Sequence, residues 1–253
     1  MPPLATRALV LHVLPYGETS KIVRLLTPDL GLASAIARGA RRARSRTGPR
    51  LDLFAEGAAT LHLKPQRELH PLVAFEITDA HPHLAHDVSR FAAASALTEI
   101  VLRCTTHDPH PEVYAAATAG LTAVEHAPPE LAASAALVAC WGLVVALGFA
   151  PTLERCAVCG ADVGEAVHFS AAQGGAVCAR HRAGERASRL APADRAALAA
   201  LVSGRLPERP LDPRHAAAHR RLLLGFIRWH LAEQHPMPAL AFWDAESWNS
   251  TSS

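Results

Sequence analysis

The hydrophobic pattern of this chain changes once, near His81, and that change restricts the fold class. Before it, short apolar runs alternate with turn residues such as Gly, Pro and Asp. Five runs read as strands: 7–16, 21–28, 32–39, 59–65 and 72–78. Five short strands in about seventy residues are typical of a small barrel or sandwich. We expect a five-stranded OB-fold barrel over residues 1–79.

Beyond His81 the chain becomes rich in alanine, with apolar residues at helical spacing. Start and stop signals bound five segments, which we expect to be helices: 87–106, 111–127, 128–148, 191–204 and 214–235. The fold class predicted is therefore α+β and multidomain. A helical domain of residues 80–150 and 186–244 follows the barrel, a separate segment of residues 151–185 interrupts it, and a polar tail of residues 245–253 frays.

The interrupting segment carries two pairs of metal-ligand residues. Cys156 and Cys159 form a C-x-x-C pair, and Cys178 and His181 form a C-x-x-H pair. Two such pairs, each in a tight turn, are the ligand pattern of a zinc ribbon, in which four protein ligands surround one ion. Buried thiols without metal and a redox C-x-x-C are the alternatives; a redox motif would not explain the second pair and needs a βαβ context that this sequence lacks. We predict one structural Zn²⁺ per chain.

The five cysteines indicate the cellular compartment. Their number is odd, and the first residues lack the basic start and unbroken apolar run of a secretion signal. Cys104 and Cys140 fall in helical apolar patterns and should be core thiols. The most apolar run, residues 137–150, is short for a membrane span. We expect a cytoplasmic protein with no membrane segment.

No catalytic motif survives inspection. His110 and Glu112, with the later Cys156 and Cys159, imitate the H-x-E…P-C-x-x-C pattern of zinc deaminases, but Arg155 replaces the proline. Four ligands would also leave zinc without an open position for water. The sequence contains no phosphate-binding loop, H-E-x-x-H or G-x-S-x-G pattern. We expect no enzyme, and a deaminase-like hydrolase is a distant alternative.

Positive charge is concentrated at the start of the chain. The formal net charge is only +2, yet residues 1–76 hold eleven Lys and Arg against six Asp and Glu. Residues 37–50 alone contain six arginines and no acidic residue. A charge run of this kind is usually a solvated surface, but it can also hold a polyanion. The residues around this stretch have to decide between a solvated surface and a binding site for a polyanion.

Specific stretches of the chain resemble the RecO family of bacterial DNA repair proteins. They are YGETSKIVRLLTPDLGL (16–32), ARGARRARSRTGPRLDLF (37–54), the L-x-L-K run at 61–64, Glu76, and LGFAPTLERCAVCG (147–160). The resemblance covers most of residues 1–182. Many members carry a second Cys-x-x-Cys where this chain has Cys178-Ala-Arg-His181, and histidine is an equally competent zinc ligand.

The resemblance implies a recombination mediator. Such a protein binds single- and double-stranded DNA, anneals complementary strands, and with RecR helps to load RecA onto DNA coated by single-strand-binding protein, whose acidic tail it contacts. It would work in the cytoplasm, associated with the nucleoid, without a consumed cofactor. We then expect the basic stretch to contact the DNA backbone, with Arg7 and Lys64 on adjoining strands as further candidates. The DNA-binding residues predicted are Lys21, Arg24, Arg38, Arg41, Arg42, Arg44 and Arg46. The alternative function is a zinc-ribbon scaffold whose basic loop binds protein or RNA.

Overall fold

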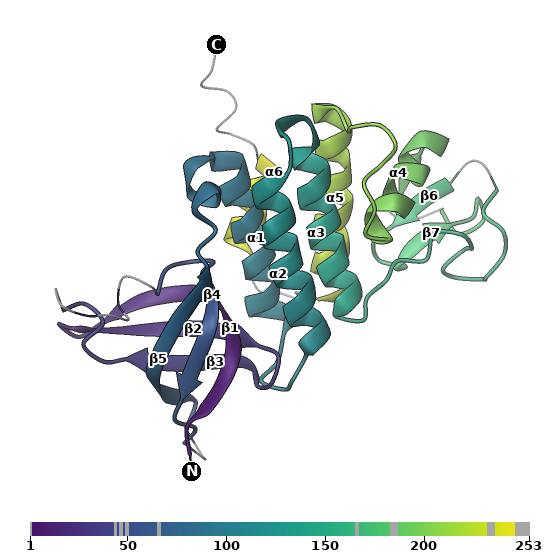
Figure 1. Ribbon diagram of the computed structural model, residues 1–253. Helices are drawn as coiled ribbons and strands as arrows, with labels where there is room; N and C mark the ends of the chain where they lie inside the picture. The colour runs from purple at the N-terminus through teal and green to yellow at the C-terminus, as the bar shows by residue number, and fades with distance from the viewer. Residues whose placement is uncertain are drawn as a thin grey trace.

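The computed structural model describes residues 2–42, 45, 48, 51–64, 67–164, 167–182, 187–231 and 236–245. The described chain forms three parts that lie in a row: a β-barrel, a bundle of helices, and a small sheet at the far end (Figure 1). The N-terminus lies at the barrel (Figure 1).

Five strands close the barrel in the order β1-β2-β3-β5-β4, with β4 returning to β1. Only β3 and β5 pair in parallel; the other neighbours are antiparallel. The strands are β1 (Leu4–Tyr16), β2 (Ser20–Thr27), β3 (Gly31–Ala37), β4 (Glu56–Leu61) and β5 (Leu69–Asp79). This five-stranded closed barrel confirms the fold class expected for the N-terminal part.

Alternation along the strands gives the barrel two apolar faces. Val23 and Leu25 point inward with Val10 and Phe75, where they form the barrel core. Leu26, next along β2, points outward and belongs to the core of the helical bundle. Part of the outer face of the barrel is therefore buried against the helices instead of facing water.

The helical bundle follows directly. It consists of η2 (Pro82–His86), α1 (Val88–Cys104), α2 (Pro111–His126), η3 (Pro129–Leu131), α3 (Ala132–Ala146), α4 (Pro192–Val202), α5 (Pro213–His230) and α6 (Pro238–Ala245). α3 is the central helix and packs against α1, α2, α4 and α5. Trp141 of α3 is fully buried, and its ring meets that of Phe226 of α5 edge-on, with the ring centroids 5.4 Å apart. The five expected helices are confirmed.

One segment of the bundle, Pro129–Ala146, has the length and apolar character of a membrane span. Half of it is buried inside the protein, where α3 lies among four other helices. This is the position of a core helix, and one such segment is weak evidence for a membrane.

Close backbone contacts join the barrel to the bundle. The N–H of Leu32 donates to the carbonyl of Thr106 at 3.0 Å, and His107 Nδ1 lies 2.6 Å from the carbonyl of Leu32. Gly31 makes this approach possible: its φ is +63°, and a Cβ there would overlap the carbonyl oxygens of Asp108 and Thr106. The turn between β2 and β3 is thereby fixed on the connection between α1 and α2.

The small sheet has the strand order β7-β6-β8 and completes the third part. Its strands are β6 (Val167–Ser170), β7 (Gly175–Val177) and β8 (Ser188–Leu190). Arg195 of α4 donates to the carbonyls of Gly164 and Leu153, and His230 Nε2 lies 2.7 Å from the carbonyl of Ala171. Side chains of α4 and α5 thus hold this sheet on the bundle.

Several expected details differ from the structure. β4 begins at Glu56 and ends at Leu61, so residues 62–64 are not part of a strand. The helix α6 and the strand β8 were not expected. Of the expected tail, Ala245 is the last residue of α6, and 246–253 lie outside the described residues. The division into domains 1–79, 80–150 with 186–244, and 151–185 stays a prediction, because core residues are shared across the barrel–bundle contact.

Candidate DNA-binding rim, pocket and metal centre

The described part of the basic stretch lies at one end of the barrel. Lys21 pairs with Ala37 there, and Tyr16 pairs with Ser20. Arg38, Arg41 and Arg42 follow β3 and are all exposed. The opposite end of the barrel carries the turn that contacts Thr106, so this rim faces away from that contact. Arg44 and Arg46 lie outside the described residues.

The loop is pinned to the barrel by its own hydrogen bonds. The backbone N–H of Arg41 donates to Thr19, and its guanidinium donates to the carbonyl of Gly17 at 3.2 Å. The N–H of Gly48 donates to Ser45 Oγ at 3.0 Å. Among the residues described, neither Arg38, Arg41 nor Arg42 forms an ion pair. Three cations without a carboxylate partner therefore face solvent on a fixed rim.

Lys21 occupies a different position from the arginines. It has the inward orientation of Val23 and Leu25, and its Nζ donates to the carbonyls of Gly48 at 2.9 Å and Leu51 at 3.1 Å. Leu51 is fully buried in the barrel core. The ammonium group of Lys21 therefore fixes, from the barrel side, the loop that carries the exposed arginines.

The remaining sequence candidates are dispersed. Arg24 is half-buried on the outer face of β2, opposite His12 and next to the bundle. Arg7 lies over the ring of Tyr114 of α2 at 5.1 Å, a cation–π contact between barrel and bundle. Lys64 follows Leu61, which pairs with Leu4 at the other end of the barrel. The structure brings Arg38, Arg41, Arg42 and Lys21 together but not Arg7, Arg24 or Lys64.

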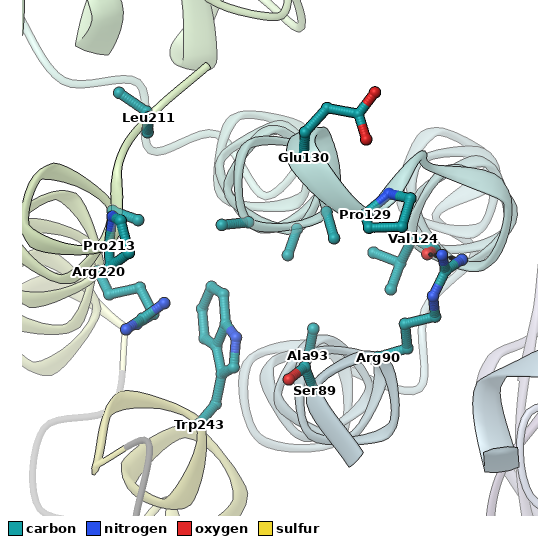
Figure 2. A pocket seen from close by; sticks show the side chains of 14 residues that line it. Ser89, Arg90, Ala93, Val124, Pro129, Glu130, Leu211, Pro213, Arg220 and Trp243 are labelled. Atoms are coloured by element: carbon teal, nitrogen blue, oxygen red, sulfur yellow. Dashed lines mark hydrogen bonds between the residues drawn. The ribbon is translucent and has the colours of Figure 1, made fainter. Parts of the chain in front are cut away.

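A pocket of about 330 Å³ opens between the helices of the bundle, and we call it the bundle pocket (Figure 2). Its walls are mostly apolar and come from α1, α2, α3, α5 and α6. Arg220 and Trp243 stand on one side, with the guanidinium of Arg220 5.7 Å from the Trp243 ring, and Arg90 stands on the other (Figure 2). Arg90 also donates to the carbonyls of Val124 and Ala127 at the end of α2. The pocket combines a hydrophobic floor with cations at two edges, and its lining also contains the carboxylate of Glu130.

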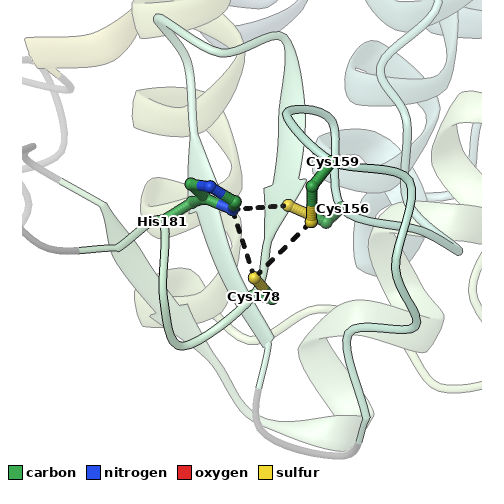
Figure 3. Close-up of side chains that lie close together, drawn as sticks. All are labelled: Cys156, Cys159, Cys178 and His181. Atoms are coloured by element: carbon green, nitrogen blue, oxygen red, sulfur yellow. Dashed lines mark hydrogen bonds between the residues drawn. The ribbon is translucent and has the colours of Figure 1, made fainter.

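The four predicted metal ligands lie together in the third part of the fold. Figure 3 shows Cys156, Cys159, Cys178 and His181 directed at one point, and their ligand atoms lie within 4.8 Å of one another. Cys156 Sγ is 3.6 Å and Cys178 Sγ is 3.3 Å from His181 Nδ1, while Cys159 Sγ is 4.0 Å from Cys178 Sγ. The edges of a tetrahedron built from ordinary Zn–S and Zn–N bonds measure about 3.5 to 3.8 Å. The geometry fits a tetrahedral ion bound through Nδ1.

Backbone turns prepare these ligands for a cation. Burial opposes ionisation of Cys156, but the N–H groups of Cys178, Cys159 and Val158 lower the pKa of its thiol to about 5. Cys178 also has a lowered pKa, against the effect of burial, because the N–H of Arg180 and the ring of His181 stabilise its thiolate. Neighbouring thiols raise the pKa of Cys159, despite an N–H bond from Ala161. Two thiolates and a third sulfur at such short distances call for a positive ion.

Residues outside this cluster do not contribute to it. Cys140 is buried within α3 and Cys104 is half-buried at the end of α1, and burial raises the pKa of their thiols to about 12 and about 11. His110 and Glu112 lie at the start of α2, 3.3 Å from each other, and do not belong to the metal cluster. The deaminase-like arrangement of His110, Glu112 and the cysteines is therefore not assembled.

Sequence reasoning overlooked a second titratable cluster, at the junction of barrel and bundle. His81 is buried, with Nδ1 2.6 Å from Glu125 of α2 and Nε2 3.0 Å from Glu56 of β4. Its φ of 45° is left-handed, and its N–H donates to Asp79 Oδ1. Burial lowers the pKa of His81, but the bonds to Glu56 and Glu125 outweigh burial and raise it to about 9. His81 was passed over because it stands among many histidines.

Comparison with known proteins decides the family. Residues 1–81 match the model of the recombination protein O N terminal domain, and residues 85–238 match that of the recombination protein O C terminal domain. The chain is 35% identical over 232 residues to the DNA repair protein RecO of Anaeromyxobacter sp. (strain K), with 89% of this chain and 91% of that protein covered. The chain belongs to the RecO family.

A second relative gives the same result. The DNA repair protein RecO of Anaeromyxobacter dehalogenans (strain 2CP-1 / ATCC BAA-258) is also 35% identical, with the same coverage. Membership of the RecO family makes this chain a protein of DNA repair and recombination, and neither matched family is catalytic. The resemblance found in the sequence is confirmed.

Proposed function

We propose that this chain is a recombination mediator. It binds single- and double-stranded DNA, anneals complementary strands, and with RecR helps to load RecA onto DNA coated by single-strand-binding protein. It acts in the cytoplasm, on the nucleoid. The observation that carries the proposal is the fixed rim of Arg38, Arg41 and Arg42, three exposed cations without an ion-pair partner among the described residues. Arg44 and Arg46, which follow closely in the sequence, are proposed as further DNA-binding residues.

The rim suits the backbone of DNA better than its bases. Guanidinium groups neutralise phosphates and release condensed counterions, whatever the sequence. Tyr16, 53% exposed beside the rim, is the aromatic residue nearest in sequence that could stack on a base. Binding should therefore depend strongly on salt and weakly on sequence, as strand annealing requires.

Zinc has a structural role in this proposal. Cys156, Cys159, Cys178 and His181 would hold one Zn²⁺, and these four ligands would fill its coordination sphere and leave no position for a substrate. The ion would neutralise the thiolates and cross-link the two turns of a small sheet that has few core residues of its own. No catalytic step is assigned to it.

The bundle pocket is the site that we propose for the acidic tail of single-strand-binding protein. Arg90 and Arg220 would face the carboxylates of such a peptide, and the wall beside Trp243 would take an apolar side chain. Ala133, half-buried in the lining, offers a matched test. Ala133→Glu should abolish binding of a tail peptide measured by fluorescence anisotropy, while Ala133→Lys should retain it. Equal binding by the two variants would place the peptide elsewhere.

Annealing of complementary oligonucleotides tests the main function. The purified chain should accelerate annealing of bare strands and of strands coated with single-strand-binding protein. Annealing at the uncatalysed rate under both conditions would contradict the proposal. If the chain instead binds RNA or a protein partner in a salt-sensitive way and does not anneal DNA, the alternative is favoured. That alternative is a zinc-ribbon scaffold that uses its basic loop for such a partner.

A further inference from the structure

A second pocket, which we call the junction pocket, lies where the barrel meets the helical bundle. It has a volume of about 450 Å³ and is bounded by the outer face of β1 and β2, by α1, and by the start of α6. This volume falls within the range of about 300 to 1,000 Å³ that is typical of small-molecule sites. The residues that matter below are His12, Arg24, Ser95, Glu99, Leu102 and Arg103.

Two arginines give the pocket a cationic side. Arg24 comes from the barrel and Arg103 from α1, so the two charges converge from different parts of the fold. The Nε–H of Arg24 is buried and has no hydrogen-bond partner among the described residues. A buried donor without an acceptor is unfavourable and is usually matched by a ligand or water. The arrangement points to an anionic oxygen as the missing partner.

The one acidic residue of the pocket is already engaged. Glu99 accepts the backbone N–H of Leu240 at 2.8 Å, at the first turn of α6. Burial raises the pKa of Glu99, although the N–H groups of Leu240 and Ala239 and the charge of Arg103 oppose this shift. The carboxylate is thus used to cap α6. The balance of charge at the opening of the pocket remains positive.

The remaining walls suit a flat apolar group. Leu11, Leu53 and Leu102 line the pocket between the polar residues. An organic ring with an attached anion would satisfy both the leucines and the arginines, and a nucleotide has that composition. A free inorganic anion would match the arginines but not the apolar side of the pocket.

An exposed strip of β1 connects the junction pocket to the basic rim. His12, Leu14 and Tyr16 are exposed at alternate positions, and Tyr16 precedes Gly17, whose carbonyl accepts from Arg41. At about 3.3 Å per residue, His12 and Tyr16 lie roughly 13 Å apart. A few nucleotides of extended single strand can cover this distance.

We propose that the junction pocket takes one nucleotide out of a single strand that runs from the basic rim along β1, with its base between the leucines and its phosphate against Arg24 and Arg103. This inference rests on the proposed function, since it requires that the rim bind DNA. A paired base cannot enter without leaving its duplex, at a cost in pairing and stacking. The pocket is therefore specific for single strands, whereas the rim accepts both forms.

Two variants of the full chain test this proposal, and each has a control. Arg103→Ala removes an exposed cation from the pocket, and Arg205→Ala removes an exposed cation outside the pocket lining. Ser95→Trp fills the pocket from α1, and its thermal unfolding shows whether the fold is retained. Affinity for a labelled single strand and for the matching duplex is measured by anisotropy over a range of salt concentrations. A 2-aminopurine base in the single strand reports unstacking through increased fluorescence.

We expect the two variants to lose affinity for single strands and not for duplex. Arg103→Ala should weaken single-strand binding about three- to tenfold and flatten its salt slope by about 0.7, with duplex binding changed less than about twofold. Ser95→Trp should weaken single-strand binding and remove the rise in 2-aminopurine fluorescence. Arg205→Ala should behave as the wild type in each measurement.

Three results would overturn the proposal. Both variants could bind single strands with the affinity of the wild type, or their affinities for single strands and for duplex could fall equally. The variants could instead fail to bind an acidic tail peptide and still bind single strands, which would make the pocket a peptide site. Failure of the wild type to bind any DNA would contradict the proposed function itself, so the two failures are distinguishable.

Discussion

His81 Nδ1 lies 2.6 Å from Glu125 Oε2, and this contact joins the end of the barrel to α2 of the bundle. The opposite ring nitrogen lies 3.0 Å from Glu56 of β4, so one protonated imidazole bridges two carboxylates from different parts of the fold. A neutral ring could donate to only one of them, and the other carboxylate, in a largely buried site, would lose its donor from His81. The proton on His81 therefore holds the barrel and the bundle in one arrangement.

The first prediction concerns the pH dependence of this bridge. The pKa of His81 rises from 6.5 in the unfolded chain to about 9 in the fold. Its stabilisation is therefore complete below pH 6.5 and is lost as pH rises through about 9. A shift of this size is worth roughly 3 kcal/mol. Urea unfolding between pH 6 and 10 should give a higher free energy of unfolding for the wild type than for His81→Asn. This difference should shrink as pH rises. A difference that is constant over this range would contradict the bridge.

The second prediction compares two glycines with similar backbone angles. Gly31 has φ +63° and no room for a Cβ against Asp108, whereas Gly17 has φ +55° and nothing within 4 Å. Both substitutions to alanine carry the left-handed cost of about 1–2 kcal/mol. Gly31→Ala should lower the free energy of unfolding by at least about 2 kcal/mol more than Gly17→Ala, because the connection between α1 and α2 must move. Midpoints of urea unfolding measure this, and equal losses would show that the contact does not hold the junction.

The third prediction concerns the metal content. Freshly purified protein should contain about one zinc per chain. Cys178→Ala should lose the metal and lower the solubility of the chain before it weakens DNA binding, because the ion supports the small sheet and not the rim. His181→Cys should keep the metal, and His86→Ala, an exposed histidine elsewhere, is the control. Elemental analysis well below half an equivalent in the wild type would rule out the site.

The fourth prediction is that the chain hydrolyses neither nucleotides nor DNA. The sequence has no phosphate-binding loop, and the carboxylates of the described cluster at His81 are bound to that histidine instead of being free for magnesium. ATP turnover and nuclease activity should stay at background through successive purification steps. Turnover that follows the protein and disappears with one substitution would overturn this expectation.

The repeating patterns of the sequence predicted much of the fold. Alternation along the first 79 residues predicted the barrel, and helical spacing predicted α1 to α5. The cluster of Cys156, Cys159, Cys178 and His181 was predicted from spacing, because two tight turns of fixed length must each direct two side chains to one side. α6 was overlooked because its eight residues follow no clear capping signal and are held by a distant partner, Glu99.

The parts of the candidate site that were missed depend on tertiary contacts. Lys21 was grouped with the exposed arginines, but it shares the inward face of β2 with Val23 and Leu25, and strand alternation could have shown this. Arg24 borders the bundle because α1 and α6 cover that side of the barrel. Nothing in the local sequence indicates which face of a barrel a later helix will cover. The contact of His81 with Glu125 spans 44 positions and has no sequence signal.

The salt dependence of DNA binding tests the central claim most directly. Each phosphate contact contributes about −0.9 to the slope of log K against log salt on duplex DNA and about −0.7 on single strands. Replacing Arg38, Arg41 and Arg42 together with alanine should weaken binding to all sequences and flatten the duplex slope by roughly two to three units. Zinc content and thermal stability should not change, and Arg189→Ala, an exposed arginine of the small sheet, should keep the wild-type slope. If the triple variant keeps both the affinity and the slope of the wild type, the rim does not bind DNA and the account is contradicted.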